Sequence, residues 1–201
     1  MGAHVGLVSL QVAARRVGVG VAVHAFEPSS INAARFRRNV ELNAIQDVTL
    51  NQVAVGDREG EAELAWDAAG TDYAGSRLTE SGRFSDGSGV ERVRTILLDR
   101  YAEERAIERV DVLKLDVEGS ETSAIDGASS LLAAGRVGCV ICELNDVYLA
   151  QRGLERADLA ASLGGFGYRP VAIPPVGAQR VRVGRRAGAV VDAAFVRNGT
   201  A

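Results

Sequence analysis

The stretch that decides the fold is Val110-Asp111-Val112-Leu113-Lys114-Leu115-Asp116-Val117-Glu118-Gly119. Residues 110–115 form a nearly continuous apolar run, which is typical of a strand buried on both faces, as in a parallel sheet. The run ends at the acidic turn 116–119. The next apolar residues recur at helical spacing and predict one amphipathic helix after Gly119, with a stripe formed by Ala124, Ile125, Ala128, Leu131 and Leu132.

The rest of the chain repeats this alternation of strand and helix. We expect strands at 21–26, 48–55, 61–66, 93–97, 110–115, 137–142, 168–173 and 190–196. We expect three further helices. One starts after a capping Ser29 or Ser30, one runs from a capping Asp99 to Ile107, and one covers residues 154–163. Strands and helices of these lengths predict an α/β fold with a mostly parallel sheet.

Two connections between these elements differ from the rest. A hairpin is expected across residues 57–60, between the strands at 48–55 and 61–66. Residues 68–91 are rich in glycine, serine, threonine and aspartate, and they predict a long loop. Because structureless connections of this length in compact domains are usually functional, we expect this loop to act as a lid that shapes a binding pocket.

Length and composition exclude several classes of protein. The chain has 201 residues, of which 47% are hydrophobic and 24% are charged, which fits one ordinary globular domain. A net charge of −3 argues against a dedicated nucleic-acid-binding protein. We find no apolar run of the ~20 residues that a membrane helix needs, and no secretion signal. The expectation is a cytoplasmic protein without nucleic-acid or membrane partners.

Acidic residues follow the ends of several expected strands. Glu27, Asp57, Asp116 to Glu118, and Glu143 all stand at such positions. Ligands of open parallel sheets bind outside the carboxyl ends of the strands. The sequence therefore predicts that these carboxylates line one ligand-binding crevice.

The N-terminal turn and the first of these acids suggest a nucleoside. The turn from Gly2 to Gly6 precedes an expected helix, so a ligand can approach its backbone closely. Glu27 lies about 20 residues further on, at the end of the next strand, where an acidic residue can accept both hydroxyls of a ribose.

Five motifs in this order resemble one known family. They are Gly2-Ala3-His4-Val5-Gly6, His24-Ala25-Phe26-Glu27-Pro28, Asn39-Val40-Glu41-Leu42-Asn43, Val53-Ala54-Val55-Gly56-Asp57 and Leu113-Lys114-Leu115-Asp116-Val117-Glu118-Gly119. Together they are similar to the FkbM family of S-adenosylmethionine-dependent methyltransferases, from Gly2 to about Arg197. The resemblance implies the class I methyltransferase fold, a Rossmann-like three-layer sandwich whose last strand is antiparallel. It also implies O-methylation of a small-molecule hydroxyl on a sugar, a polyketide or another secondary metabolite.

The same resemblance assigns the cofactor contacts. It implies that Gly2, Ala3 and Gly6 border the methionine part of S-adenosylmethionine. Glu27, with Pro28 beside it, would hold the ribose, Gly56 and Asp57 would lie by the adenine, and Asp116 would lie near the transferable methyl group.

The acceptor hydroxyl needs help, because an alcohol is a poor nucleophile at neutral pH. Asp116 is the leading candidate base, and Glu143 ends the neighbouring strand. Because adjacent strands lie ~4.8 Å apart, Asp116 and Glu143 could also share one divalent ion such as Mg²⁺. Without a metal, Asp116 is a direct base, and Glu118 and Glu121 are partners of the dipole of the following helix. Lys114 is expected to form an ion pair with Asp116 or a helix carboxylate.

One part of the family pattern is missing. The family's first motif begins with a strand and an acidic residue directly before the glycine turn, whereas here Met1 stands next to Gly2. The expectation is a single, N-terminally truncated methyltransferase domain over residues 1–201 that lacks the first strand, folds poorly and binds cofactor weakly.

Two alternatives remain open. One is a non-catalytic, truncated methyltransferase-like protein that keeps the fold as a binding surface. The other is an NAD-dependent Rossmann oxidoreductase, although the turn has only Gly2 and Gly6 in place of Gly-x-Gly-x-x-Gly. Cys139 and Cys142 do not suggest a metal or redox site, because residues three apart on a strand point to opposite faces. We expect both to be buried core residues.

Overall fold

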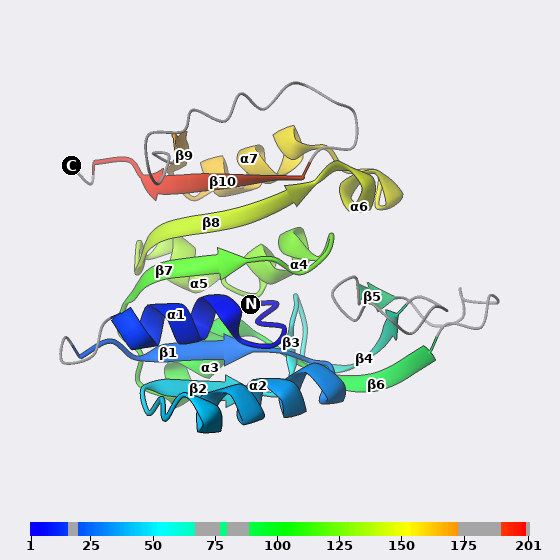
Figure 1. The fold of residues 1–201 in the computed structure, drawn as a ribbon. Coiled ribbons are helices and arrows are strands. Elements are labelled where there is room, and N and C mark those ends of the chain that lie inside the picture. The colour runs from blue at the N-terminus through cyan, green and yellow to red at the C-terminus, as the bar shows by residue number, and fades with distance from the viewer. Residues whose placement is uncertain (16–19, 67–76, 80–88, 173–189, 200–201) are drawn as a thin grey trace, which may run out of the picture. The chain divides into compact units, whose positions relative to one another are not determined.

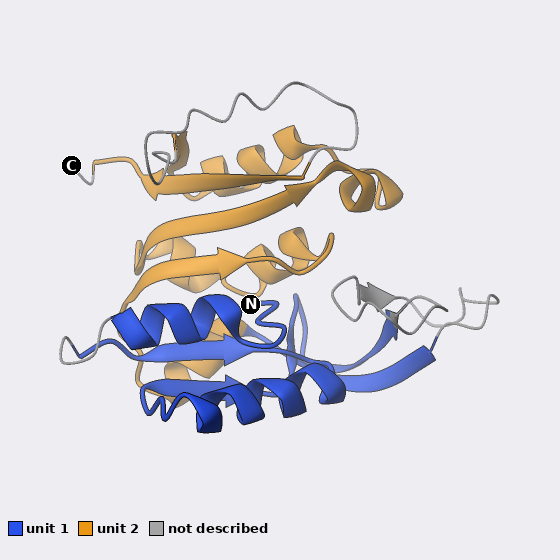
Figure 2. Ribbon diagram, in the orientation of Figure 1, with its two compact units in different colours: residues 1–97 blue, residues 98–201 orange. Residues whose placement is uncertain are grey.

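The computed structural model describes residues 1–15, 20–66, 77–79, 89–172 and 190–199. The chain forms two compact units, residues 1–97 and residues 98–201, which Figure 2 shows in different colours. The expected single domain over 1–201 stays a prediction. No helix in the described part of the chain is both long enough and apolar enough to cross a membrane.

The described residues of the first unit form two helices and two sheets (Figure 1). Its elements are α1 (Leu7–Arg15), β1 (Val23–Phe26), α2 (Ser30–Leu42), β2 (Val48–Asn51), β3 (Ala54–Val55), β4 (Gly60–Trp66), β5 (Arg77–Thr79) and β6 (Gly89–Ile96). Strands β1 and β2 pair in parallel, while the second sheet has the order β3-β6-β4-β5. Helix α1 packs against β1 and helix α2 against β2, so both helices begin close to the carboxyl end of β1.

Three expectations for this unit were wrong in detail. Residues 48–55 form two strands in different sheets, because β2 pairs in parallel with β1 whereas β3 pairs in parallel with β6. The hairpin across 57–60 does not form: β4 pairs along its whole length with the longer β6, from Gly60 opposite Thr95 to Trp66 opposite Gly89. The expected loop 68–91 contains β5 and the start of β6. Its remaining residues lie outside the described ranges, so the lid stays a prediction.

The second unit carries the motif at 110–119. Its elements are α3 (Leu98–Glu104), β7 (Val110–Leu115), α4 (Glu121–Asp126), α5 (Ser129–Ala133), β8 (Val137–Asn145), α6 (Asp146–Gln151), α7 (Arg156–Gly165), β9 (Tyr168–Val171) and β10 (Val190–Arg197). The sheet has the order β7-β8-β10-β9. Strand β7 is parallel to β8, and β10 is antiparallel to both of its neighbours. The antiparallel last strand is therefore confirmed.

The helix expected after Gly119 is broken into α4 and α5. Its apolar stripe is nevertheless buried as expected, with Ile125 and Leu132 fully enclosed. The break leaves α5 with its own N-terminus and free backbone N–H groups. The Asp99 carboxylate accepts from two of them, Ser130 N at 2.7 Å and Leu131 N at 2.9 Å. The expected role of Asp99 as the cap of its own helix was therefore wrong.

The expectation of one mostly parallel sheet was also wrong for the described strands, which form three separate sheets. Among these strands, β1 and β7 each stand at the edge of their sheet. The three-layer arrangement and the absent first strand stay predictions.

Candidate cofactor and catalytic sites

The glycine turn of the first unit is anchored to the end of β1. Ala3 N donates to Phe26 O at 3.0 Å, and Asn39 Nδ2 of α2 donates to Val5 O at 2.8 Å. Gly6 has φ +91°, and a Cβ there would lie 2.9 Å from the ring of Phe36. Glycine is thus required at this position both by backbone conformation and by space.

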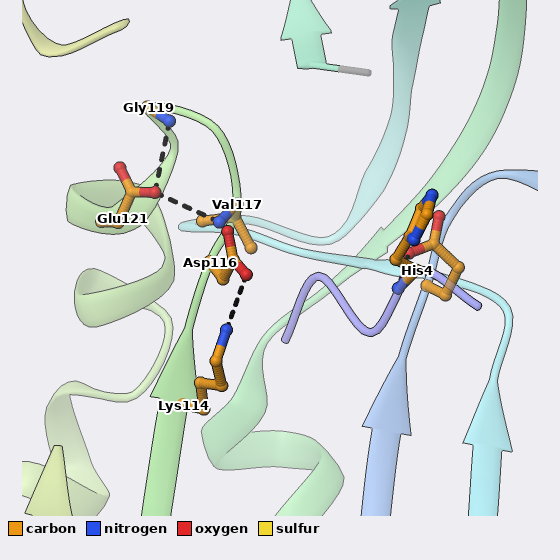
Figure 3. Close-up of polar contacts among 7 residues, drawn as sticks. His4, Lys114, Asp116, Val117, Gly119 and Glu121 are labelled. Carbon is orange, nitrogen blue, oxygen red and sulfur yellow. Dashed lines mark hydrogen bonds and ion pairs between the residues drawn. The ribbon is translucent and has the colours of Figure 1, made fainter. Parts of the chain in front are cut away.

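Glu27 joins this turn to the start of α2. Its carboxylate accepts from His4 N at 2.7 Å and from Ser29 N at 3.0 Å, and it is also hydrogen-bonded to the Asn32 side chain (Figure 3 shows His4). The side chain is buried, and burial raises the pKa of its carboxyl group although these three bonds act in the opposite direction. A carboxylate has about four acceptor sites, so the three bonds leave room for a further donor such as a hydroxyl. The structure thus brings Gly2, Ala3, Gly6, Glu27 and Pro28 to one place.

The start of α2 is fixed by two further groups. The Ser29 side chain accepts from Asn32 N at 3.3 Å, so of the two serines expected as a cap it is Ser29 that serves. Glu91 of β6 accepts from Ser30 N, with its two oxygens at 3.2 and 3.0 Å. Glu91 was not predicted from the sequence, because its partner Ser30 is far away in the chain.

Gly56 and Asp57 follow β3. Gly56 N donates to Ile96 O at 3.0 Å, so this turn is held by β6, and Asp57 is exposed. The turn belongs to a different sheet from β1. A role beside adenine stays a prediction for both residues.

In the second unit, Asp116 lies in a charged cluster at the end of β7. Lys114 Nζ lies 2.6 Å from Asp116 Oδ2, which confirms the expected ion pair (Figure 3). One carboxylate oxygen each from Asp116, Glu118 and Glu143 lie within 4.8 Å of one another. From the sequence, Glu118 was expected among the carboxylates after the strands and as a helix-dipole partner, but not as a possible metal ligand; the structure places it beside the two predicted acids.

Glu143 was expected at the end of its strand. It lies inside β8 instead, because this strand continues to Asn145. The expectation failed because the apolar run stops at Cys142 while the pairing with β10 continues, with Glu143 opposite Asp192. Burial, followed by the negative charge of Asp116, raises the pKa of the Glu143 carboxyl group, and the ammonium of Lys114 opposes that rise. The cluster therefore contains more carboxylates than its single nearby lysine can balance.

Glu121 holds the turn that carries two of these acids. One of its oxygens accepts from Val117 N at 3.1 Å and from Gly119 N at 3.2 Å (Figure 3). The side chain is only 3% exposed, and burial raises its pKa. Glu121 does stand in the first turn of α4, as a dipole partner would, but its bonds are to the preceding turn.

The two cysteines lie in β8. Cys142 is buried, as expected, and burial raises the pKa of its thiol to about 12. Cys139 is only half-buried, so the expectation of two buried cysteines was wrong for this one. A thiol with so high a pKa is not a nucleophile at neutral pH.

Comparison with known proteins gives an independent view of the chain. The model of the methyltransferase FkbM domain matches residues 1–170. The chain is also 30% identical over 121 residues to the 2-O-methyltransferase NoeI of Sinorhizobium fredii. That stretch covers 55% of this chain and 49% of NoeI, so the chain spans about half the length of this curated relative. No solved structure matches the chain.

The match to the family model includes the glycine turn, Glu27, and the whole of the acidic motif after β7. Membership implies a Rossmann-like methyltransferase fold and S-adenosylmethionine as the methyl donor. On this evidence, the chain belongs to the FkbM family of methyltransferases.

Proposed function

We propose that this protein transfers a methyl group from S-adenosylmethionine to a hydroxyl of a small-molecule acceptor. The observation that carries the proposal is Glu27, a buried carboxylate tied by backbone N–H groups to the glycine turn and to the start of α2. A fixed, buried acceptor of this kind favours a ligand that offers hydroxyl donors, as a ribose does, and disfavours a phosphate in the same place.

The proposal includes the other cofactor contacts that the family resemblance implies. Gly2, Ala3 and Gly6 border the methionine part, and Glu27 with Pro28 holds the ribose. Gly56 and Asp57 lie by the adenine, and Asp116 lies near the methyl group. Gly2 and Gly6, which both have a left-handed backbone, support the methionine contacts, because a residue without a side chain lets a ligand approach its main chain.

Asp116 acts as the base in this proposal. The acceptor oxygen attacks the methyl carbon, the carbon–sulfur bond breaks with its electron pair on sulfur, and the hydroxyl proton passes to the Asp116 carboxylate. Lys114, with its Nζ 2.6 Å from Asp116 Oδ2, orients that carboxylate. Orientation of the two reactants can supply roughly 7–11 kcal/mol of the barrier reduction.

A divalent ion is a second way to activate the hydroxyl. The oxygens of Asp116, Glu118 and Glu143, all within 4.8 Å of one another, are the hard ligands that Mg²⁺ prefers. The ion would lower the pKa of the bound hydroxyl, so that Asp116 would act as a ligand. Activity that survives EDTA assigns Asp116 the role of direct base, and activity that EDTA removes and Mg²⁺ restores assigns it the role of ligand.

The acceptor is proposed as a class. The relative NoeI is a 2-O-methyltransferase, which supports oxygen as the methylated atom. A hydroxyl of a sugar, a polyketide or another secondary metabolite fits this chemistry.

Calorimetric titration with S-adenosylhomocysteine and, separately, with NADH tests the proposal. We expect binding of the first and none of the second, followed by transfer of a labelled methyl group to a hydroxylated acceptor. Binding of NADH alone would favour an oxidoreductase. Binding of S-adenosylhomocysteine without transfer to any of a panel of sugars and polyketides would favour a non-catalytic protein.

A further inference from the structure

The turn that follows β7 has an unfavourable backbone. Glu118 has φ +52° and Gly119 has φ +91°, so two successive residues adopt the left-handed conformation. For a residue with a side chain, such as Glu118, this conformation costs about 1–2 kcal/mol. The turn therefore needs other interactions to keep Asp116 and Glu118 in place.

Glu121 accepts hydrogen bonds from the two backbone N–H groups that directly follow the acids of the turn. Its oxygen accepts from Val117 N, which directly follows Asp116, and from Gly119 N, which directly follows Glu118. Each bond fixes the peptide plane after one of the two acids. Because the side chain is 3% exposed, water does not readily replace either bond.

Further contacts of the turn come from α6 and from Arg152, which follows it. A Cβ on Gly119 would lie 3.0 Å from Tyr148 Cβ and 3.2 Å from Tyr148 O. Arg152 Nη2 donates to Ser120 Oγ at 3.0 Å. These contacts set where the turn lies, whereas Glu121 is placed to set the direction of the two peptides that carry the acids.

We propose that Glu121 is a positioning residue for the proposed methyl transfer: its buried carboxylate holds the 116–119 turn so that the Asp116 carboxylate points at the acceptor hydroxyl. This inference rests on the proposed function. The Glu121 side chain itself touches neither cofactor nor acceptor in this assignment. Its contribution passes through the two acids of the turn, of which Asp116 is the proposed base.

The test compares Glu121→Ala with Glu121→Gln, using Asp126→Ala as the matched control. The glutamine side chain keeps an oxygen that can accept the same two bonds, whereas alanine leaves both N–H groups without it. Asp126 is an exposed acid at the end of the same helix. The readouts are kcat, KM for the acceptor, the Kd of S-adenosylhomocysteine, and the melting temperature.

We expect Glu121→Ala to lower kcat on the order of 10- to 100-fold, the size of effect produced by displacing a reacting group by about 1 Å. Glu121→Gln restores most of this loss, and Asp126→Ala has wild-type kcat. The Kd of S-adenosylhomocysteine changes much less than kcat, because Glu27 and the glycine turn are untouched.

A second background separates positioning from general destabilisation. In a protein that already carries Asp116→Asn, adding Glu121→Ala should lower kcat no further, since there is no base left to position. An equal loss in both backgrounds, or a Glu121→Ala variant with wild-type kcat, would overturn the inference. If Glu121→Ala does not fold, Glu121→Gln in the two backgrounds decides, because any loss it causes must again vanish with Asp116→Asn. Failure of the wild-type protein to bind S-adenosylhomocysteine is a separate result that overturns the proposed function.

Discussion

Glu27 and Asp116 both follow a parallel strand, yet their surroundings differ. Glu27 lies after β1, is 5% exposed, and receives backbone N–H groups on both oxygens. Asp116 lies after β7, its side chain is 27% exposed, and its closest partner is the flexible ammonium of Lys114. Two further carboxylates, Glu118 and Glu143, lie near Asp116.

Under the proposed function, this difference separates the proposed ribose-binding carboxylate, Glu27, from the proposed base, Asp116. A buried carboxylate bonded to the main chain has a fixed direction and suits the recognition of neutral hydroxyls. A partly exposed carboxylate can be reached by an acceptor hydroxyl, as general-base catalysis requires. The same sequence signal, an acid after a strand, thus supports two different roles.

Asp116→Asn is the change expected to have the largest effect. Removing a general base lowers kcat by about 10²- to 10⁴-fold, because proton removal then falls to water. Steady-state kinetics with labelled S-adenosylmethionine measures the loss. The control is Asp111→Asn on the same strand, an exposed acid 3.0 Å from Arg109. Activity of Asp116→Asn within threefold of the wild type would remove Asp116 from the mechanism.

Glu27→Ala should act on binding more than on turnover. Loss of charged hydrogen bonds worth roughly 1.5–3 kcal/mol raises the Kd of S-adenosylhomocysteine by about 10- to 100-fold, with a smaller change in kcat at saturating cofactor. Titration calorimetry measures the Kd. Glu41→Ala on the exposed face of α2, where Glu41 pairs with Arg38, serves as the control. If Glu27→Ala lowers kcat and leaves the Kd unchanged, the division between the two acids is wrong.

The features of both sites that depend on residues close together in the chain could be predicted from the sequence. The apolar run at 110–115 predicted β7 with its observed ends. The expected burial on both faces was wrong for the first half of the strand, where Asp111 and Val112 are exposed. Ser29 was one of the two serines predicted as the cap, because the cap bond spans only three residues. The ion pair of Lys114 with Asp116 was predicted because alternate residues of a strand share a face.

Interactions between distant residues decided what the sequence could not predict. Whether residues 48–55 form one strand or two depends on β1 and β6, which are their partners. The bonds of Asp99 to α5 and of Glu91 to α2 cross long stretches of chain. The position of Glu118 near Asp116 depends on a left-handed turn, which a glutamate does not signal.

The pH dependence of Glu27 offers a further test with a smaller effect. Burial raises the pKa of this carboxyl group above its usual 4.5 in the folded protein. A raised pKa means that the folded state holds the proton more tightly than the unfolded chain does. The contribution of Glu27 to stability is therefore complete below about pH 4.5 and is lost as the pH rises through the folded-state pKa.

Glu27→Gln should remove this dependence. We expect its melting temperature relative to the wild type to rise between acidic and neutral pH, because the variant carries no charge to bury. The cofactor affinity of Glu27→Gln relative to the wild type should fall over the same pH range, since wild-type Glu27 becomes a stronger hydrogen-bond acceptor as it ionises. Thermal melts and calorimetry from pH 4 to 8 measure both. A melting-temperature difference that does not vary with pH would show that Glu27 has no raised pKa.

Glu91→Ala should have the smallest effect and refines the account of the cofactor side. Glu91 shares the inner face of β6 with Val93 and Thr95, and it reaches Ser30 N beside the Glu27–Ser29 bond. Because this contact is exposed, water can replace the lost acceptor, and we expect the Kd of S-adenosylhomocysteine to rise only about 2- to 5-fold. Glu61→Ala, which breaks an exposed pair with Arg92 in the same sheet, is the control and should bind as the wild type does. If Glu91→Ala and Glu61→Ala raise this Kd equally, the β4–β6 pairing, and not the bond to Ser30, supports the proposed ribose-binding carboxylate of Glu27.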